Sequence, residues 1–127
     1  FLRLDSFRTV KWESGSACAD LAEMNDSTWA IARPEWSRAG GSVLVCRGAE
    51  YDITTDELQV GGRPLRVCWD EYSDLLYVGS RTDDGNTLIS AWSPESSQVT
   101  AEVKLDGFLQ DMAVTPGESR LIVLLYE

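Results

Sequence analysis

The stretch that decides the fold is LRVCWDEYSDLLYVGSRTDDGNTLISAWSPESSQVTAEVKL, residues 65–105. Short runs of Leu, Val, Ile, Tyr and Trp alternate in it with turns made of Asp, Ser, Gly and Pro. Runs bounded by turn-forming residues every 8 to about 12 residues are typical of antiparallel β structure. Asp84-Gly85 favours a tight hairpin, because glycine adopts a positive φ without strain. We therefore expect four strands here, over 65–70, 74–80, 86–93 and 97–105.

A unit of about 40 residues recurs along the chain, marked by an aromatic residue near the end of a strand. Trp12, Tyr51 and Trp92 are separated by 39 and 41 residues, and each is followed by a polar residue and a turn. Pro34 and Pro116, 82 residues apart, align as a second mark at twice this period. Periods of this length indicate propellers or other repeat arrays. We expect each aromatic ring to fill the gap between two neighbouring sheets.

This register predicts an all-β chain, 1–127, with about three units' worth of four-stranded antiparallel sheet. Half a unit covers 7–24, with strands at 7–13 and 17–24. Full units cover 28–61 and 65–105, and the first of these has strands at 28–34, 42–48, 49–54 and 57–61. A last half unit covers 109–126, with strands at 109–116 and 119–126. The best helix candidate, CADLAEMND at 18–26, is short and ends in turn-forming residues. A small β-sandwich or a PH-like barrel, with fewer strands, is the alternative fold.

Composition narrows the range of partners. Hydrophobic residues make up 43% of the chain, and 21 acidic residues against 11 basic ones give a net charge of −10. Nucleic-acid backbones and anionic membranes repel such a chain, and no apolar run approaches the roughly 18 residues of a membrane span. We expect neither nucleic acid nor membrane as a partner. A basic surface on a partner protein fits the charge, and a role in solubility alone also accounts for it.

The three cysteines, Cys18, Cys46 and Cys68, lie in apolar stretches without CxxC spacing. An odd number of cysteines cannot be fully paired within one chain. We expect buried free thiols in a reducing compartment, hence an intracellular and cytoplasmic location.

The chain begins at Phe1 without an initiator Met and ends on the apolar run LIVLLYE. Since natural termini are more often polar, we expect a piece of a longer protein.

Residues 65–105 resemble a repeat of the WD-repeat-like β-propellers. Gly79-Ser80, Asp84-Gly85 and Trp92-Ser93 stand where that family carries a Gly-Ser pair, an Asp-Gly turn and a Trp-Asp pair. Two departures are plain: no unit has an intact Trp-Asp, and the chain has no histidine for the family's buried His-Asp-Ser-Trp network.

The resemblance extends to the neighbouring units, where Trp12-Glu13 and Tyr51-Asp52 match the Trp-Asp position. It implies blades that need neighbours to bury both of their faces. Three blades' worth of strands is fewer than the 4 to about 8 blades of an ordinary closed ring. The resemblance therefore implies assembly with the remaining blades of a parent protein, or a homodimer of two such chains.

Catalytic and metal-binding patterns are weak. Without histidine, a Ser-His or Cys-His couple cannot form within this chain. The acidic residues Asp70, Glu71 and Asp74 and the pair Asp83-Asp84 lack the spacing of a calcium loop, so we interpret them as solvated turns. The scattered cysteines do not make a tetrahedral zinc set. We expect no catalytic residues, no metal, no cofactor and no enzyme activity.

One segment is a candidate contact surface. ARPEWSRAGG, residues 32–41, joins two expected strands and places Trp36 between Arg33 and Arg38. Trp and Arg are the residues most enriched in binding hot spots. With loops 35–41 and 61–64 as the specificity loops, the candidate partner-binding residues are Arg33, Trp36, Arg38 and Arg63. The alternative is that Trp36 folds back onto its own sheet with an arginine stacked on it.

These observations favour a non-catalytic scaffold that binds partner proteins through loops on one face of a propeller. The alternative is an enzyme or small-ligand-binding propeller whose active site lies in blades outside this chain.

Overall fold

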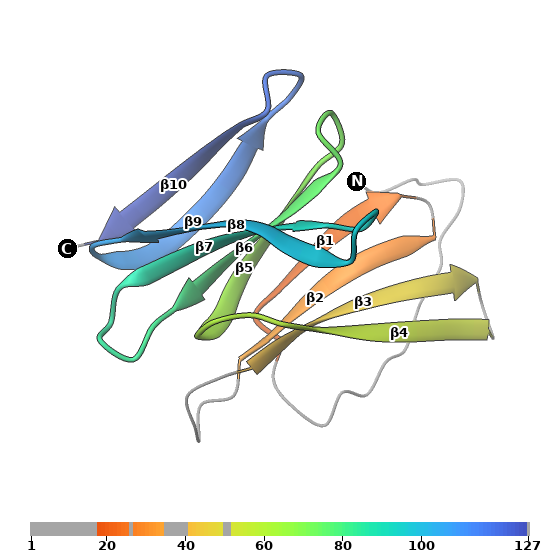
Figure 1. The fold of residues 1–127 in the computed structure, drawn as a ribbon, viewed down its shortest axis with the longest axis horizontal. Helices are drawn as coiled ribbons and strands as arrows, with labels where there is room; N and C mark the ends of the chain where they lie inside the picture. The colour runs from red at the N-terminus through yellow and green to blue at the C-terminus, as the bar shows by residue number, and fades with distance from the viewer. Residues whose placement is uncertain (1–17, 26, 35–40, 50–51, 127) are drawn as a thin grey trace.

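The structure, a computed structural model, describes residues 18–25, 27–34, 41–49 and 52–126 (Figure 1). Within these ranges the chain is all-β, as predicted, with ten strands in three antiparallel sheets. Each sheet is a meander in which consecutive strands pair. Sheet A consists of β1 (Asp20–Asn25), β2 (Thr28–Pro34), β3 (Gly41–Ala49) and β4 (Asp52–Gln59). Sheet B consists of β5 (Arg63–Asp70), β6 (Leu75–Arg81), β7 (Thr87–Ser93) and β8 (Gln98–Leu105), and sheet C of β9 (Phe108–Thr115) and β10 (Arg120–Tyr126).

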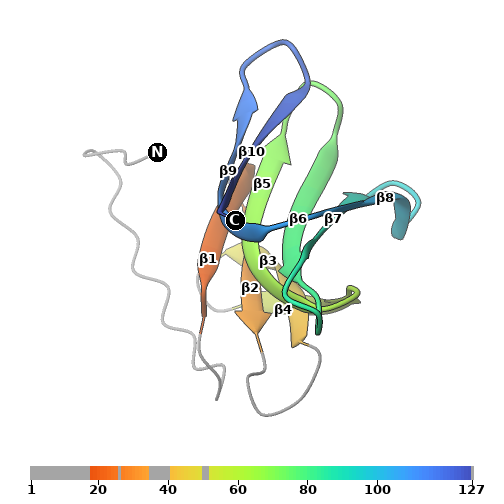
Figure 2. The ribbon, with the colours of Figure 1, turned by 90° about the vertical axis from the view of Figure 1, so that its left-hand side faces the viewer.

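The three sheets stack face to face in chain order, with their first strands β1, β5 and β9 next to one another (Figures 1 and 2). Two polar contacts join these first strands. The backbone N–H of Val67 donates to Oδ2 of Asp20 at 3.0 Å, which links β5 to β1. Nε of Arg66 lies 3.7 Å from Oδ1 of Asp111, which links β5 to β9. In the first of these contacts, a carboxylate of sheet A accepts from a backbone N–H of sheet B.

The main core lies between sheets A and B. Ala30, Val43 and Val45 of sheet A pack in one cluster with the side chains of sheet B. The members contributed by sheet B are Val67, Leu76, Val78 and Trp92. Trp92 is only 4% exposed near the end of β7, so the prediction that this ring fills the gap between two sheets is confirmed. Trp12 and Tyr51, the other two marks of the repeat, lie outside the described residues.

Sheet A is apolar on both of its faces. Ala30 and Val45 are opposite each other on the face toward sheet B, whereas Ile31 and Leu44 are opposite each other on the other face. Ile31 and Leu44 form a second buried cluster with Cys46. A β-strand points alternate side chains to opposite faces, so an unbroken run of apolar residues identifies a strand that is covered on both sides.

Sheet B meets sheet C across a glycine. A Cβ atom on Gly79 of β6 would lie 2.4 Å from Cδ2 of Leu109 and 2.7 Å from Sδ of Met112, both on β9. No real Cβ tolerates such distances. The missing side chain lets the β9 residues reach the backbone of β6. Met112 is 7% exposed as a result.

The first expected unit boundary is wrong. We expected the strand at 17–24 to close a half unit over 7–24, but β1 pairs with β2 and is the first strand of sheet A. The 18–26 helix candidate is likewise this strand over Asp20–Asn25. The reason lies in the turn, where Oδ1 of Asn25 accepts a hydrogen bond from the N–H of Ser27 at 3.0 Å. This side chain-to-backbone turn reverses the chain at once and returns it along β1. The strand expected at 7–13 lies outside the described residues.

The end of sheet A also differs from the prediction. The strands expected at 49–54 and 57–61 are one strand, β4, which pairs with β3 along its whole length. Its polar sequence DITTDELQ suggested a turn, yet an outer strand tolerates polar residues because one edge and most side chains face water. Arg47 and Asp56 form an ion pair across the two strands.

Since sheet A contains β1, the two prolines of the repeat alignment do not correspond. Pro34 ends β2, the second strand of its sheet, whereas Pro116 follows β9, the first strand of its sheet. In contrast, the expected strands of 65–105 and 109–126 coincide within two residues with β5 to β10.

Replacing Trp92 by alanine tests the sheet-to-sheet core. We expect Trp92→Ala to lower the free energy of unfolding by about 3–5 kcal/mol, the usual cost of removing a large buried aromatic side chain. Urea denaturation followed by circular dichroism measures it. The matched control is Tyr72→Ala, because Tyr72 is 76% exposed. Equal stabilities for the two variants would contradict the assignment of Trp92 to the core.

Candidate functional site

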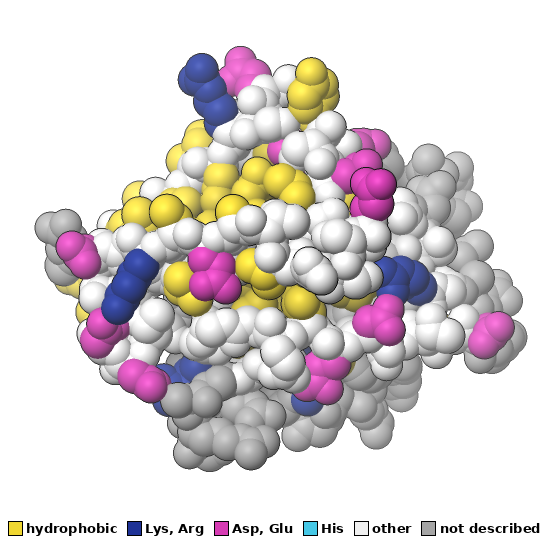
Figure 3. All heavy atoms as spheres, in the orientation of Figure 1, with side chains coloured by type: hydrophobic (Ala, Val, Ile, Leu, Met, Phe, Trp, Pro, Cys, Tyr) yellow, Lys and Arg dark blue, Asp and Glu magenta, His cyan; other side chains and the backbone are white. Residues whose placement is uncertain are grey.

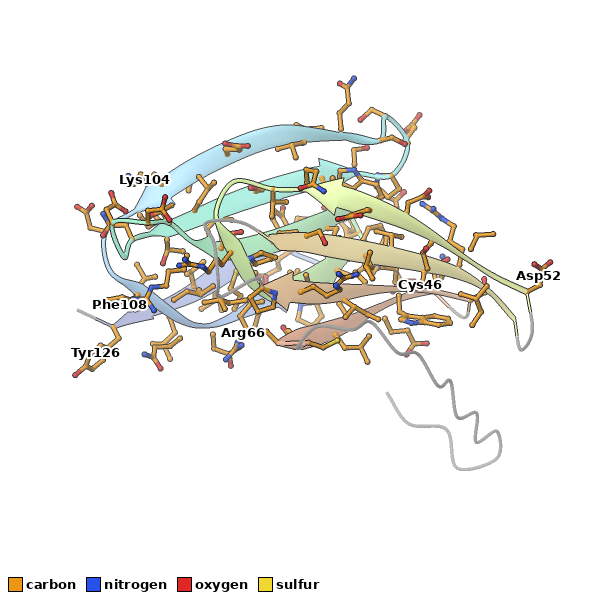
Figure 4. All side chains as sticks on the ribbon, turned by 90° about the horizontal axis from the view of Figure 1, so that it is seen from below. Cys46, Asp52, Arg66, Lys104, Phe108 and Tyr126 are labelled. Carbon is orange, nitrogen blue, oxygen red and sulfur yellow. The ribbon has the colours of Figure 1, made fainter. Side chains whose placement is uncertain are left out.

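The strand ends that flank the expected contact loops lie at the same end of the sheets. Arg33, Ser42 and Gln59 are in one row across β2, β3 and β4. The next strand, β5, begins at Arg63, which pairs with Arg81 at the end of β6. We call this part of the molecule the loop end, defined by residues 60–62, 82–86 and 106–107. Figure 4 shows Lys104 and Phe108 toward this end and Asp52 at the opposite one.

The structure brings two of the four expected partner-binding residues to this end. Arg33 and Arg63 are both partly buried, and both take part in further contacts. Trp36 and Arg38 lie outside the described residues. The described part of the expected site is therefore a pair of arginines on neighbouring sheets.

The hairpin loop between β6 and β7 is closed by its own hydrogen bonds. The N–H of Thr82 donates to the carbonyl of Asn86 at 2.9 Å, and the N–H of Gly85 donates to the carbonyl of Thr82 at 3.0 Å. Gly85 has a φ of 84°, which confirms the tight Asp84-Gly85 turn expected from the sequence. Asp84 accepts from the Thr82 hydroxyl and from the N–H of Asn86. The loop thus has a defined backbone conformation.

Two contacts anchor this loop to the rest of the loop end. Nζ of Lys104, on β8, donates to Oδ2 of Asp84 at 2.8 Å. The Lys104 ammonium and the Thr82 hydroxyl lower the pKa of Asp84, and the same pairing raises the pKa of Lys104. Both side chains are about half exposed, so solvent and salt weaken the pair. On the other side, Oδ1 of Asn86 accepts from the N–H of Gly107 at 3.2 Å.

A cation–π pair joins the loop ends of sheets B and C. The guanidinium carbon of Arg81 lies 4.6 Å from the centre of the Phe108 ring. The same ring covers Gly85, where a Cβ atom would lie 3.3 Å from Phe108. Phe108 is still 40% exposed. An exposed aromatic ring held between an arginine and a fixed loop is a rigid, amphipathic contact element.

The sequence alone did not point to Arg81 and Phe108, because their contact depends on the stacking of the sheets. Arg81 ends the second strand of sheet B, and Phe108 begins the first strand of sheet C. In the preceding pair of sheets, Arg33 lies next to the end of β2 and Arg63 begins β5. Arg33 and Arg63 therefore hold nearly the same places as Arg81 and Phe108. The repeat would have pointed to Arg81 and Phe108 if the first strand of each sheet had been assigned correctly.

The acidic turn at the opposite end of sheet B is structural. The Ser73 hydroxyl donates to Oδ2 of Asp70 at 2.5 Å, and the N–H of Tyr72 donates to Oδ1 at 3.1 Å. These hydrogen bonds, the Ser73 bond foremost, lower the pKa of Asp70 against the effect of its burial. Asp70 is 2% exposed, whereas Glu71 and Asp74 point to solvent. The described residues contain no group of three or more Cys, Asp or Glu side chains placed to hold a metal ion.

None of the three cysteines forms a disulfide, and they differ in exposure. Cys46 is buried and Cys68 is partly buried, but Cys18 is exposed, so the expectation of burial is wrong for Cys18. Burial raises the pKa of the Cys46 thiol. Burial, together with the carboxylates of Asp20 and Asp111, raises the pKa of Cys68 to about 11. A thiol with such a pKa is a poor nucleophile at neutral pH.

Comparisons with known proteins found no match: no family model, curated protein or solved structure matches the chain. None of the described residues forms a helix of the length and apolar character that crossing a membrane requires. The fold and the loop end define an all-β chain of stacked antiparallel sheets with a preformed loop surface.

The Asp70 turn predicts a defined pH dependence of stability. Because the folded-state pKa of Asp70 lies below 3.8, its carboxylate stabilises the fold above that pH, and this contribution is lost as the pH falls through the folded-state pKa. We expect Asp70→Asn to cost about 1–2 kcal/mol at pH 7. The difference from the original protein shrinks below a pH of about 4. Urea unfolding between pH 7 and pH 2 measures it, with Asp83→Asn as an exposed control. A difference that is constant with pH would contradict the assignment.

Thiol labelling tests the environment of the cysteines. At pH 8 only about one Cys68 thiol in a thousand is ionised when its pKa is about 11. We expect iodoacetamide to modify Cys18 first, and Cys46 and Cys68 only after unfolding, because the thiolate is the nucleophile. Mass spectrometry of the tryptic peptides gives the order. Labelling of Cys68 as fast as that of Cys18 would show that its surroundings differ from those described.

Proposed function

We propose that this chain is part of a β-propeller-like protein and works as a non-catalytic scaffold that binds partner proteins through its loop end. The observation that carries the proposal is the exposed Phe108 ring, which lies 4.6 Å from the Arg81 guanidinium, beside the β6–β7 loop that is fixed by its own hydrogen bonds. The intracellular location expected from the cysteines is part of the same proposal.

The residue types at the loop end support protein binding. Aromatic residues and arginine are enriched at the centres of protein interfaces, where they contribute large contact areas. Arg63 and Arg81 are opposite each other across β5 and β6, and the Arg81 guanidinium lies over the Phe108 ring. Asp83 and Asp106, each two residues in sequence from Arg81 or Phe108, are exposed. A surface with both signs of charge around an aromatic centre favours a partner with complementary charges, and it gives specificity more than affinity.

The rigidity of the loops supports the same conclusion. Binding by a mobile loop costs the free energy of ordering its side chains and backbone. Asp84 and Asn86 fix the β6–β7 loop to Lys104 and Gly107 before any partner arrives. Thr87, fully buried, donates to the carbonyl of Gly107 at 2.8 Å and adds a third link. The loop end is therefore preorganised.

A matched pair of variants tests this function. We expect the double variant Arg81→Ala/Phe108→Ala to bind a partner protein at least about tenfold more weakly. The partner is first captured on the immobilised chain, identified by mass spectrometry, purified and then titrated by calorimetry. Tyr72→Ala is the control, since Tyr72 is 76% exposed on the turn at the opposite end of sheet B.

The outcomes separate clearly. Loss of affinity in the double variant alone, with unchanged circular dichroism, supports binding through the loop end. Equal affinity of the double variant and the original protein rejects it. A loss caused by Tyr72→Ala alone would move the contact surface to the other end of the sheets.

A further inference from the structure

Sheet B has three arginines that point to one face next to the loop end. Gly79 of β6 faces sheet C, because a Cβ atom on it would meet Leu109 and Met112 of β9. Arg81 is two residues further along β6, so its side chain points to the same face. The Arg81 guanidinium lies over the ring of Phe108, the first residue of β9, which confirms this direction.

Two arginines of β5 share this face through their pairing with β6. Arg63 is the cross-strand partner of Arg81, and Arg66 is the partner of Gly79. Cross-strand partners of an antiparallel pair have their side chains on the same face. Nε of Arg66 lies 3.7 Å from Oδ1 of Asp111 on β9, which confirms the direction of this side chain. We call Arg63, Arg66 and Arg81 the arginine cluster.

The arginine cluster is a local exception in an acidic chain. The net charge is −10, and Figure 3 shows Asp and Glu side chains spread over one side of the molecule. Like charges directly opposite each other on neighbouring strands are destabilising. Arg63 and Arg81 have this arrangement. An anion bound between their guanidinium groups would remove a repulsion and would also form charge-assisted hydrogen bonds.

Two carboxylates contact β5, and each of them also has a backbone partner. Oδ1 of Asp111, which lies 3.7 Å from Nε of Arg66, accepts from the N–H of Met112 at 2.9 Å. Oδ2 of Asp20 accepts from the N–H of Val67 at 3.0 Å. Asp111 is exposed, and an exposed ion pair at such a separation contributes little. These carboxylates therefore compensate the positive charge of the arginine cluster only in part.

The arginine cluster is accessible to a ligand. The Arg66 side chain is 35% exposed, and Arg63 and Arg81 are half-buried. Arg63 also takes part in a further contact. A guanidinium presents several N–H donors in a planar fork, so it can keep one contact and still bind an oxyanion. Because half-buried side chains have already lost part of their rotamer freedom, less entropy is lost when a ligand binds them.

The surroundings favour a compact ligand of high charge. Asp83 and Asp106 are exposed, each two residues in sequence from Arg81 or Phe108. A row of carboxylates on a partner would spread its negative charge toward these acidic residues. A phosphate group concentrates a charge of about −2 and three acceptor oxygens at one point, so that different oxygens can face different guanidinium groups. The Phe108 ring, 40% exposed, offers apolar surface to a residue beside the phosphate.

We propose that the arginine cluster binds the phosphate group of a phosphorylated side chain in the partner protein, with an apolar neighbour of that side chain against Phe108. Clustered arginines are a general means of recognising phosphorylated segments. This site rests on the proposed function, since Arg63 and Arg81 adjoin the loop end. It adds a condition to that function, because the partner binds well only in its phosphorylated form.

A peptide titration tests the site directly. The probe is a short synthetic peptide with a central phosphoserine followed by leucine, and the controls carry serine or glutamate in place of the phosphoserine. We expect the phosphopeptide to cause saturable NMR shifts at the arginine Nε–H groups and at the Phe108 amide, at constant ionic strength. We expect both control peptides to bind at least about tenfold more weakly. Equal binding of the glutamate peptide, or no shifts at about 10 mM phosphopeptide, would overturn the proposal.

Single variants locate the bound phosphate. We expect Arg66→Gln and Arg63→Gln each to weaken phosphopeptide binding at least about tenfold, because each removes charged donors. Either variant decides by itself, provided that circular dichroism shows the native fold. Arg120→Gln is the matched control, since Arg120 is exposed at the opposite end of sheet C from Phe108. We expect it to leave binding within about twofold. Equal effects of Arg120→Gln and the cluster variants would overturn the proposal.

The partner captured on the chain separates failure of this site from failure of the proposed function. We expect phosphatase treatment of the partner to weaken its binding at least about tenfold. A partner that binds equally before and after phosphatase treatment, yet loses affinity for Arg81→Ala/Phe108→Ala, would overturn the phosphate site and leave the proposed function standing. A partner whose affinity is unchanged by that double variant would instead reject the proposed function, and with it the partner assigned to this site.

Discussion

The constraint on which the rest of the structure depends is that these sheets are apolar on both faces. A half-buried sheet needs one partner layer, whereas a sheet such as A, with Ala30 and Val45 on one face and Ile31 and Leu44 on the other, needs two. Stacking in chain order satisfies this need between A and B and in part between B and C. The polar contacts between the first strands, from Asp20 to Val67 and from Arg66 to Asp111, are secondary to this burial, although they align the inner edges of the sheets. Each sheet is therefore stable only as part of the stack.

The sequence predicts the strands of this chain better than their grouping. Turn residues such as Asp84 and Gly85 act locally, so the hairpins of sheet B could be placed within two residues. The start of sheet A could not, because the short strand β1 has polar residues on its outer face and its reversal depends on one side-chain hydrogen bond at Asn25. The polar strand β4 was divided for a related reason, since an exposed edge strand and a turn have similar compositions. An error of one strand at the start was enough to align Pro34 with Pro116, which occupy different places in their sheets.

Because of the same error, Arg81 and Phe108 were not predicted as part of the candidate site. Arg33 and Arg63 could be proposed from residue type and loop position, and both lie at the loop end. Arg81 and Phe108 belong to different sheets, and their contact depends on how sheet C stacks on sheet B. No local pattern encodes that stacking. It depends on residues distant in sequence, among them Gly79 of β6 and the side chains of Leu109 and Met112 on β9.

Gly79 has a consequence for the shape of the stack as a whole. The distance between two facing sheets is set by the side chains between them, about 10 Å in an ordinary pair. Between A and B this space holds Leu76, Val78 and Trp92, whereas on the other face of β6 the backbone at Gly79 touches Leu109 and Met112 directly. The angle between two successive sheets depends on how the distance between their first strands compares with the distance between their outer strands. A single missing side chain thus acts on curvature, the property that decides whether repeated sheets close into a ring or continue as an open array.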